Sequence, residues 1–261
     1  MRPLIAILKL LLFAIWSLCM VSIQLVILIF SHKEAAYIMP YMWHHGVCTI
    51  FRVTVTTSGE VAPPNATLYI SNHMSWIDIP VIGSVLKASF VAKREVASWP
   101  LFGFLSKLQQ TAFIDRNRRS ALKEKDSLKN KLDAGKSLIL FPEGTSSDGS
   151  SILPFKSSLF ELVKGEKDIT LQPFSITIQG INNRPAITQE QRDLYAWYGD
   201  MDLAPHLWVF AQQKRIHIHL DFLPPLEIKP ESQRKELSNN AYQLILSSFT
   251  SHGKFGKIRN K

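Results

Sequence analysis

Residues 67–78 read TLYISNHMSWID, a short apolar run that leads through polar residues into a second apolar segment. The run at 67–70 has the length and composition of a buried strand, and residues from about 76 to 86 have those of a helix. A strand that turns directly into a helix is a building unit of α/β proteins. The segment therefore predicts that the surrounding chain forms a sheet covered by helices.

The same alternation continues downstream. Further strands are predicted at 89–92, 112–114, 137–141, 170–178 and 215–222, and further helices near 94–108, 118–134, 155–164 and 231–249. We expect an α/β fold with a mixed, mostly parallel sheet layered by helices. Two parts are predicted, a membrane-anchoring helical segment at 1–52 and the α/β domain at 53–261.

The N-terminal segment has the character of a membrane anchor. Residues 10–30 carry no charged side chain. At about 1.5 Å per residue, a helix of this length approaches the roughly 30 Å hydrocarbon thickness of a bilayer. The apolar stretch is longer than the 7–15 residues, approximately, of a signal-peptide core, so we expect a retained anchor.

A second apolar segment at 35–51 is interrupted by Pro40 and Gly46. It is too polar in its middle to predict a second span. It fits an interfacial helix that folds back on the first and completes a helical hairpin. Spanning and insertion into one leaflet both remain open.

The composition points to anionic partners. The formal net charge is +9, and the sequence pI is about 9.5. No helix-turn-helix, zinc-ligand spacing or RNA-binding signature accompanies this charge, so we expect an anionic membrane surface, no nucleic acid and no metal. Two cysteines, Cys19 and Cys48, are too few for a disulfide framework.

The segment after the first strand also carries chemistry. His73 and Asp78 are separated by four residues. A neutral imidazole accepts a proton from an alcohol, and a carboxylate on its other nitrogen fixes the tautomer and stabilises the imidazolium. Because five helical residues would place the two side chains roughly 140° apart, the pair must straddle the junction between strand and helix. By itself, this spacing fits a structural histidine beside a solvated or capping aspartate better than a catalytic pair.

Two further polar blocks follow predicted strand ends. The first, residues 113–116, ends in Arg116, whose guanidinium suits a phosphate. In the second, residues 141–145 read FPEGT, a tight turn with one carboxylate and one hydroxyl. Lys156 is a basic residue just after this loop, and Lys93 is a similar basic residue after another predicted strand.

The order and spacing of these three blocks resemble the glycerolipid acyltransferase superfamily, and most of all bacterial 1-acyl-sn-glycerol-3-phosphate acyltransferases of the PlsC type. The resemblance covers roughly residues 68–178. It implies that His73 deprotonates the free hydroxyl of a lysolipid, which attacks the thioester of acyl-CoA or acyl carrier protein, while Asp78 orients His73. The expected product is phosphatidic acid.

The resemblance also implies the substrate-binding residues. They are Arg116, Glu143, Gly144, Thr145, Lys93 and Lys156. No cofactor is implied beyond the acyl donor, and the implied location is a bacterial inner membrane with the catalytic domain on its cytoplasmic face. No acyl-enzyme is needed, which agrees with the lack of a Gly-x-Ser-x-Gly elbow in the sequence.

One departure concerns the acceptor. Many members have Phe-Lys-x-Gly after the Glu-Gly-Thr block, whereas residues 155–158 read FKSS here. Together with the segments at 197–201 and 205–207, this variant resembles a branch that includes acyltransferases of lyso-ornithine lipid. That acceptor lacks a phosphate and offers the hydroxyl of an acyl chain.

Two other classes of function are compatible with parts of the pattern. A membrane-bound lipid or thioester hydrolase would use the same His-Asp pair to activate water, but it usually shows a nucleophile elbow or metal ligands. A non-catalytic lipid-binding protein has no need for His73 and Asp78 together. The paired spacing favours the transferase.

Overall fold

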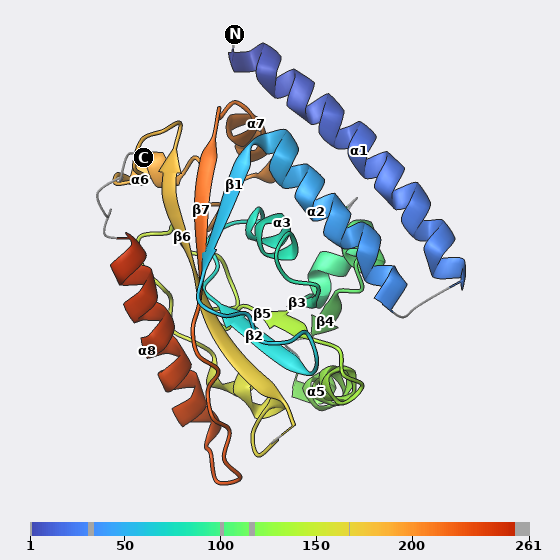
Figure 1. Ribbon diagram of the computed structural model, residues 1–261, viewed down its shortest axis with the longest axis vertical. Helices are drawn as coiled ribbons and strands as arrows, with labels where there is room; N and C mark the ends of the chain where they lie inside the picture. Colours follow the sequence, from blue (N-terminus) through green and yellow to red (C-terminus); the bar gives the residue numbers. More distant parts are fainter. Residues whose placement is uncertain (1, 31–33, 100–101, 115–117, 167, 254–261) are drawn as a thin grey trace.

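The computed structural model describes residues 2–30, 34–99, 102–114, 118–166 and 168–253 (Figure 1). Within these residues seven strands form one sheet in the order β1-β7-β6-β2-β5-β3-β4. The strands are β1 (Val53–Ser58), β2 (Thr67–Ser71), β3 (Ser89–Lys93), β4 (Ala112–Ile114), β5 (Leu138–Leu140), β6 (Thr170–Ile181) and β7 (Ile216–Phe222).

Strand direction makes the sheet mixed and mostly parallel. Only the described pair β6 and β7 is antiparallel, and every other neighbouring pair is parallel. The strands β6, β2, β5, β3 and β4 therefore all end at the same edge of the sheet. This arrangement confirms the predicted fold class.

Burial explains the hydrophobic patterns that predicted the strands. Every residue of β2 is buried, as expected for a central parallel strand with helices on both faces. Along β7 the apolar residues Ile216, Ile218, Leu220 and Phe222 are buried, and the polar residues between them are half-buried. One face of β7 therefore packs into the core while the other carries polar groups.

Helices cover both faces of the sheet. The described helices are α1 (Arg2–Phe30), η1 (Glu34–Tyr37), α2 (Ile38–Phe51), α3 (Asp78–Gly83), η2 (Arg94–Ser98), α4 (Phe102–Leu108), α5 (Arg118–Asp133), η3 (Ser157–Leu162), α6 (Gln189–Arg192), α7 (Leu203–Ala211) and α8 (Arg234–Gly253). Figure 1 shows α8 along β6, on the opposite side of the sheet from α2 and α3.

Two predicted helices differ from the structure. The helix predicted at 155–164 is the 3₁₀ helix η3, in which Leu159 N donates to Lys156 O at 3.0 Å. Serines at 157 and 158 favour local hydrogen bonds over a regular helix, and this accounts for the tighter turn. The helix predicted at 94–108 is divided into η2 and α4, and residues 100–101 between them lie outside the described residues.

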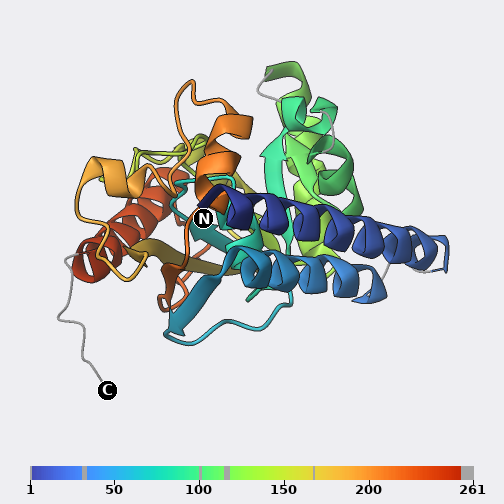
Figure 2. The ribbon, with the colours of Figure 1, turned by 90° about the horizontal axis from the view of Figure 1, so that it is seen from above.

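The two N-terminal helices form an antiparallel hairpin on the outside of the domain (Figure 2). Within the described residues, one helical segment, Pro3–Phe30, is long and apolar enough to cross a membrane. Much of its surface is exposed, and outward-facing side chains include Leu8, Ile15 and Phe30. The predicted hairpin is present.

Two buried polar side chains hold α1 against the rest of the protein. Lys9 Nζ donates to Phe51 O at 3.2 Å and to Gln213 O at 2.6 Å. Gln24 Nε2 donates to Ala36 O at 2.8 Å and to Leu108 O at 3.0 Å. Because these contacts lie near opposite ends of the helix, α1 follows the domain surface along most of its length.

Candidate active site

The predicted catalytic and binding residues follow neighbouring strands at one edge of the sheet. His73 lies just after β2, and Glu143 lies just after β5, which pairs with β2 in parallel. Lys93 is the last residue of β3, on the far side of β5. Arg116, predicted to bind a phosphate, lies outside the described residues. Carboxyl ends of parallel strands are where α/β sheets hold ligands.

His73 and Asp78 lie on either side of the junction between strand and helix, as their spacing predicts. His73 is in the irregular segment between β2 and α3, and Asp78 is the first residue of α3. His73 Nδ1 lies 2.8 Å from Asp78 Oδ2. The predicted junction between strand and helix is confirmed, although α3 begins two residues later than expected.

The Asp78 carboxylate is fully buried and fully hydrogen-bonded. Its Oδ2 atom accepts the backbone N–H of Met74 at 2.7 Å and that of Ser75 at 2.9 Å, in addition to the His73 contact. Its Oδ1 atom accepts the Tyr195 hydroxyl at 2.6 Å. A buried carboxylate with this many donors is held in one orientation.

The His73 ring is fixed on one side and open on the other. It stacks on Phe141 with ring centroids 4.0 Å apart and an interplanar angle of 11°. Because an ionised carboxylate only accepts hydrogen bonds, Nδ1 carries the proton and Nε2 carries the lone pair. The side chain remains 20% exposed. His73 therefore has the geometry of a general base whose free nitrogen is accessible.

Glu143 connects the two loops at this edge of the sheet. Its Oε1 atom accepts the His73 N–H at 2.6 Å, and its Oε2 atom accepts the Leu153 N–H at 2.7 Å. Burial raises the pKa of Glu143 to about 8, and these two N–H groups oppose the rise. The geometry assigns Glu143 a positioning role on the loop that carries His73.

The turn after Glu143 brings Gly144 and Lys156 together. Gly144 has a φ of +69°, and a Cβ built there would lie 2.3 Å from Lys156 Nζ. Lys156 N also donates to Pro142 O at 2.9 Å. Thr145 is exposed in the same turn. The predicted residues Gly144, Thr145 and Lys156 thus form one surface next to the His73 loop.

Tyr195 is a residue of this site that the sequence analysis missed. It is fully buried, and its hydroxyl reaches Asp78 across 117 residues of sequence. Nearby, Trp197 N donates to Met74 O at 2.9 Å. The segment at 197–201 that suggested the lyso-ornithine branch therefore begins directly on the loop that carries His73.

An exposed aromatic side chain lies close to this segment. Trp99 is 42% exposed, and its ring lies 6.4 Å from that of Trp197 at an interplanar angle of 86°. An apolar surface at the rim of a polar site suits a substrate with both a headgroup and an acyl chain.

Comparison with known proteins agrees with these features. The family model described as Acyltransferase matches residues 52–177. The chain is 35% identical to a lyso-ornithine lipid O-acyltransferase of Brucella abortus (strain 2308) over 220 residues, which cover 80% of this chain and 82% of the relative.

One further relative and one solved structure carry the name of the 1-acyl-sn-glycerol-3-phosphate type of acyltransferase. The chain is 29% identical to a 1-acyl-sn-glycerol-3-phosphate acyltransferase of Neisseria meningitidis serogroup B, over 72% of this chain and 71% of the relative. The fold is similar to the crystal structure of the 1-acyl-sn-glycerophosphate (LPA) acyltransferase PlsC from Thermotoga maritima, with a TM-score of 0.70 and 19% identity over 100% of both chains.

Proposed function

Because the chain belongs to the acyltransferase family, we propose that it transfers a fatty acyl group from acyl-CoA or acyl carrier protein to lyso-ornithine lipid. Membership of the family confirms the predicted resemblance and the predicted enzyme class, an acyltransferase that acts on a lysolipid. The alternatives of a hydrolase and of a non-catalytic lipid-binding protein are thereby set aside.

One observation supports the proposed reaction above all others. The buried Asp78 carboxylate holds His73 Nδ1 at 2.8 Å, which leaves Nε2 to accept a proton from the acceptor hydroxyl. As the O–H proton passes to Nε2, the oxygen attacks the thioester carbonyl and forms a tetrahedral intermediate. The intermediate collapses to the ester, and the departing thiolate receives the proton from His73. Because the acyl group arrives already activated as a thioester, this step needs no metal or prosthetic group.

Asp78 stabilises the imidazolium that forms during this step. Its negative charge lies against His73 Nδ1 and is balanced locally by the N–H groups of Met74 and Ser75 and by the Tyr195 hydroxyl. Fixed groups of this kind require no reorganisation when charge develops on the ring. We assign Tyr195 as a positioning residue, since it acts on the ring through Asp78.

The choice of acceptor rests on two features. The identity to the lyso-ornithine lipid enzyme extends over 82% of that relative's length. The segment at 197–201, which suggested this branch, contacts the His73 loop through the bond from Trp197 to Met74. Lys93 and Lys156 provide positive charge for the headgroup carboxylate.

1-Acyl-sn-glycerol-3-phosphate is the second candidate acceptor and was the first expectation from the sequence. The relative in Neisseria meningitidis favours it, as does Arg116, a side chain suited to phosphate. Both acceptors present an anionic group and a free hydroxyl, so the same chemistry at His73 applies to either.

The N-terminal hairpin supports a proposal for membrane attachment. Lys9 and Gln24 hold α1 along the domain instead of letting it project away from the domain. We therefore assign the exposed apolar face of α1 to one leaflet of an anionic membrane, with the +9 net charge assisting attachment. The predicted inner membrane and its cytoplasmic face, where acyl-CoA and acyl carrier protein are made, complete the proposal.

A two-acceptor assay tests the function. The full chain, purified in detergent, receives labelled acyl-CoA or acyl carrier protein with lyso-ornithine lipid and, separately, with 1-acyl-sn-glycerol-3-phosphate. Preferential acylation of lyso-ornithine lipid is expected. Preference for the phosphate acceptor would replace the acceptor assignment, and transfer to neither acceptor from either donor would contradict the proposed reaction.

A further inference from the structure

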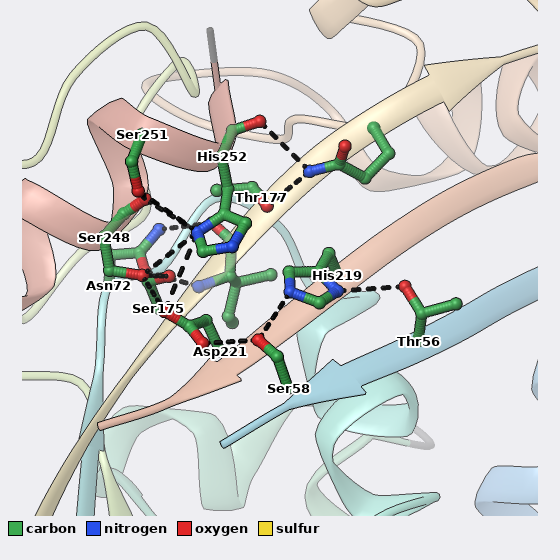
Figure 3. Close-up of polar contacts among 12 residues, drawn as sticks. Thr56, Ser58, Asn72, Ser175, Thr177, His219, Asp221, Ser248, Ser251 and His252 are labelled. Atoms are coloured by element: carbon green, nitrogen blue, oxygen red, sulfur yellow. Dashed lines mark hydrogen bonds and ion pairs between the residues drawn. The ribbon is translucent and has the colours of Figure 1, made fainter. Parts of the chain in front are cut away.

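A second polar cluster lies on the face of the sheet covered by α8. His219 and Asp221 project from β7, and His252 projects from the last turn of α8 (Figure 3). One ligand atom from each of these three side chains lies within 4.8 Å of the other two. The cluster shares no residue with the proposed active site.

Strand register explains why the cluster forms. His219 and Asp221 are two residues apart in β7, so their side chains share one face of the sheet. In the neighbouring strand β1, Thr56 is paired with His219 and Ser58 with Asp221. The polar half of the alternation in β7 therefore gathers with hydroxyl groups from β1, below the end of α8.

Hydrogen bonds around the cluster orient both imidazoles. His219 Nδ1 lies 3.0 Å from Thr56 Oγ1, and His252 Nδ1 lies 3.1 Å from the carbonyl oxygen of Ser248. In a metal-bound form, Nδ1–H groups that donate to these oxygens would leave the lone pair on Nε2 of each ring, and at His219 the ion would replace the present 2.9 Å contact between Nε2 and the Ser58 hydroxyl. This is the arrangement found around histidines that bind metal ions, where the second nitrogen donates to a neighbouring oxygen.

The carboxylate is oriented in the same way. Asp221 Oδ2 accepts the Ser248 hydroxyl at 2.5 Å, and Asp221 Oδ1 accepts the Ser58 hydroxyl. Each oxygen of Asp221 keeps a further lone pair for another partner. All three side chains are half-buried, so an ion has access from solvent while the side chains remain ordered.

We propose that His219, Asp221 and His252 form a binding site for one divalent transition-metal ion, with Zn²⁺ as the best match. Two imidazole nitrogens and one carboxylate oxygen suit Zn²⁺ and leave a fourth position for water or the Ser58 hydroxyl. With bonds of about 2.1 Å, tetrahedral ligand atoms are roughly 3.4 Å apart. The present separations, up to 4.8 Å, require a closure of up to about 1.4 Å, which movement of the His252 side chain can supply because that side chain is 36% exposed.

The site would join parts of the chain that are distant in sequence. It would attach the end of α8 to β7, beside β1 at the sheet edge. An ion that binds only the folded protein stabilises it, by an amount that rises with the logarithm of the ion concentration above its Kd. This inference departs from the sequence-based expectation of no metal, and it does not depend on the proposed acyl transfer.

Zinc binding by the full chain tests the site. The protein is purified in detergent with a tag free of histidine, treated with chelator and dialysed, and then titrated with Zn²⁺ by calorimetry. We expect one ion per chain and a higher unfolding temperature. Binding of Co²⁺ should give the visible absorption bands of a tetrahedral site.

Matched variants identify the ligands. His252→Gln, His219→Gln and Asp221→Asn should each weaken Zn²⁺ binding by roughly tenfold or more and abolish its effect on unfolding temperature. His217→Gln is the control, since His217 lies on the same face of β7 and bonds Thr56 at 3.1 Å but is outside the cluster. The absence of stoichiometric binding, or binding that survives His252→Gln in a folded protein, would overturn the proposal.

Discussion

The Tyr195 hydroxyl donates to Asp78 Oδ1 at 2.6 Å, and both side chains are fully buried. Burial, together with the charge of Asp78, holds the pKa of Tyr195 well above its ordinary value. The phenol therefore keeps its proton and acts as a permanent donor to the carboxylate. This bond links the segment before Trp197 to the residue that orients His73.

Replacing Tyr195 with phenylalanine tests this link. The variant removes one hydroxyl and leaves Asp78 Oδ1 without its buried donor, a change that costs about 1–3 kcal/mol. We expect kcat to fall roughly tenfold with the acceptor KM nearly unchanged, because Tyr195 acts through Asp78 and not on the substrate. Steady-state kinetics and thermal unfolding of the same preparation measure both effects.

Tyr198→Phe is the matched control. Its hydroxyl bonds Asp193 Oδ1 at 3.2 Å and does not reach the His73 loop. Tyr198→Phe should leave kcat unchanged. A Tyr195→Phe enzyme that loses stability but keeps its full kcat would show that the bond has only a structural role.

Asp78→Asn tests whether the reaction requires the negative charge of Asp78. In the better orientation of the amide, its oxygen still accepts from His73, Met74 and Ser75, and its NH₂ group faces Tyr195, whose hydroxyl can turn to accept. Folding should therefore survive while the stabilisation of the imidazolium disappears. We expect kcat to fall on the order of 10³-fold, with a small change in unfolding temperature.

A double variant separates the roles of the two residues. If Tyr195 acts through the Asp78 carboxylate, Tyr195→Phe should cost little further activity once Asp78 is asparagine. Full additivity of the two effects on kcat would contradict that interpretation. Single-turnover measurements with acyl donor and lysolipid give the chemical step directly.

The sequence predicted the contact between His73 and Asp78 but not the contact between Tyr195 and Asp78. His73 and Asp78 are close in the chain, so their spacing and the bend between strand and helix were enough to bring them together. Tyr195 reaches Asp78 only because its segment returns to the His73 loop after β6. No local pattern marks such a contact.

The same distinction applies to the fold. The alternation in β7 and the continuous apolar run of β2 predicted both strands, because burial sets those patterns directly. The segment at 155–164 was predicted as helical, but its apolar spacing fits both helix types and did not reveal that η3 is a 3₁₀ helix. The cluster of His219 with His252 combines β7 and α8, whose packing the sequence did not reveal.

Glu143 predicts a specific dependence of stability on pH. Its pKa is about 8 in the folded protein, against an ordinary value of 4.5. Between these values the folded state binds the proton and the unfolded state does not, so stability is greatest below about pH 4.5 and falls as pH rises through 8. We expect deprotonation of Glu143 to lower the unfolding temperature by on the order of 5 °C between pH 5 and pH 9.

Glu143→Gln should remove this dependence, because the amide is uncharged at every pH. Thermal unfolding in a series of buffers compares its slope with that of the wild type. Glu166→Gln is the control, since Glu166 forms a surface pair with Lys129 at 3.2 Å. Equal slopes for Glu143→Gln and the wild type would exclude Glu143 as the source.

Gly144 and Gly199 offer a matched pair for testing the position of Lys156. Both have positive φ, +69° and +59°, so alanine at either position strains the backbone by about 1–2 kcal/mol. Only at Gly144 would the new Cβ meet Lys156 Nζ, at 2.3 Å, whereas at Gly199 it would meet nothing within 4 Å. Gly144→Ala should therefore displace the ammonium group and raise the acceptor KM several-fold, while Gly199→Ala should lower stability alone.

Lys156→Met tests the same contact from the other side. It should raise the acceptor KM to a similar extent, and adding Gly144→Ala to the Lys156→Met variant should raise the KM no further. Equal KM values for Gly144→Ala and Gly199→Ala would exclude Lys156 from acceptor binding.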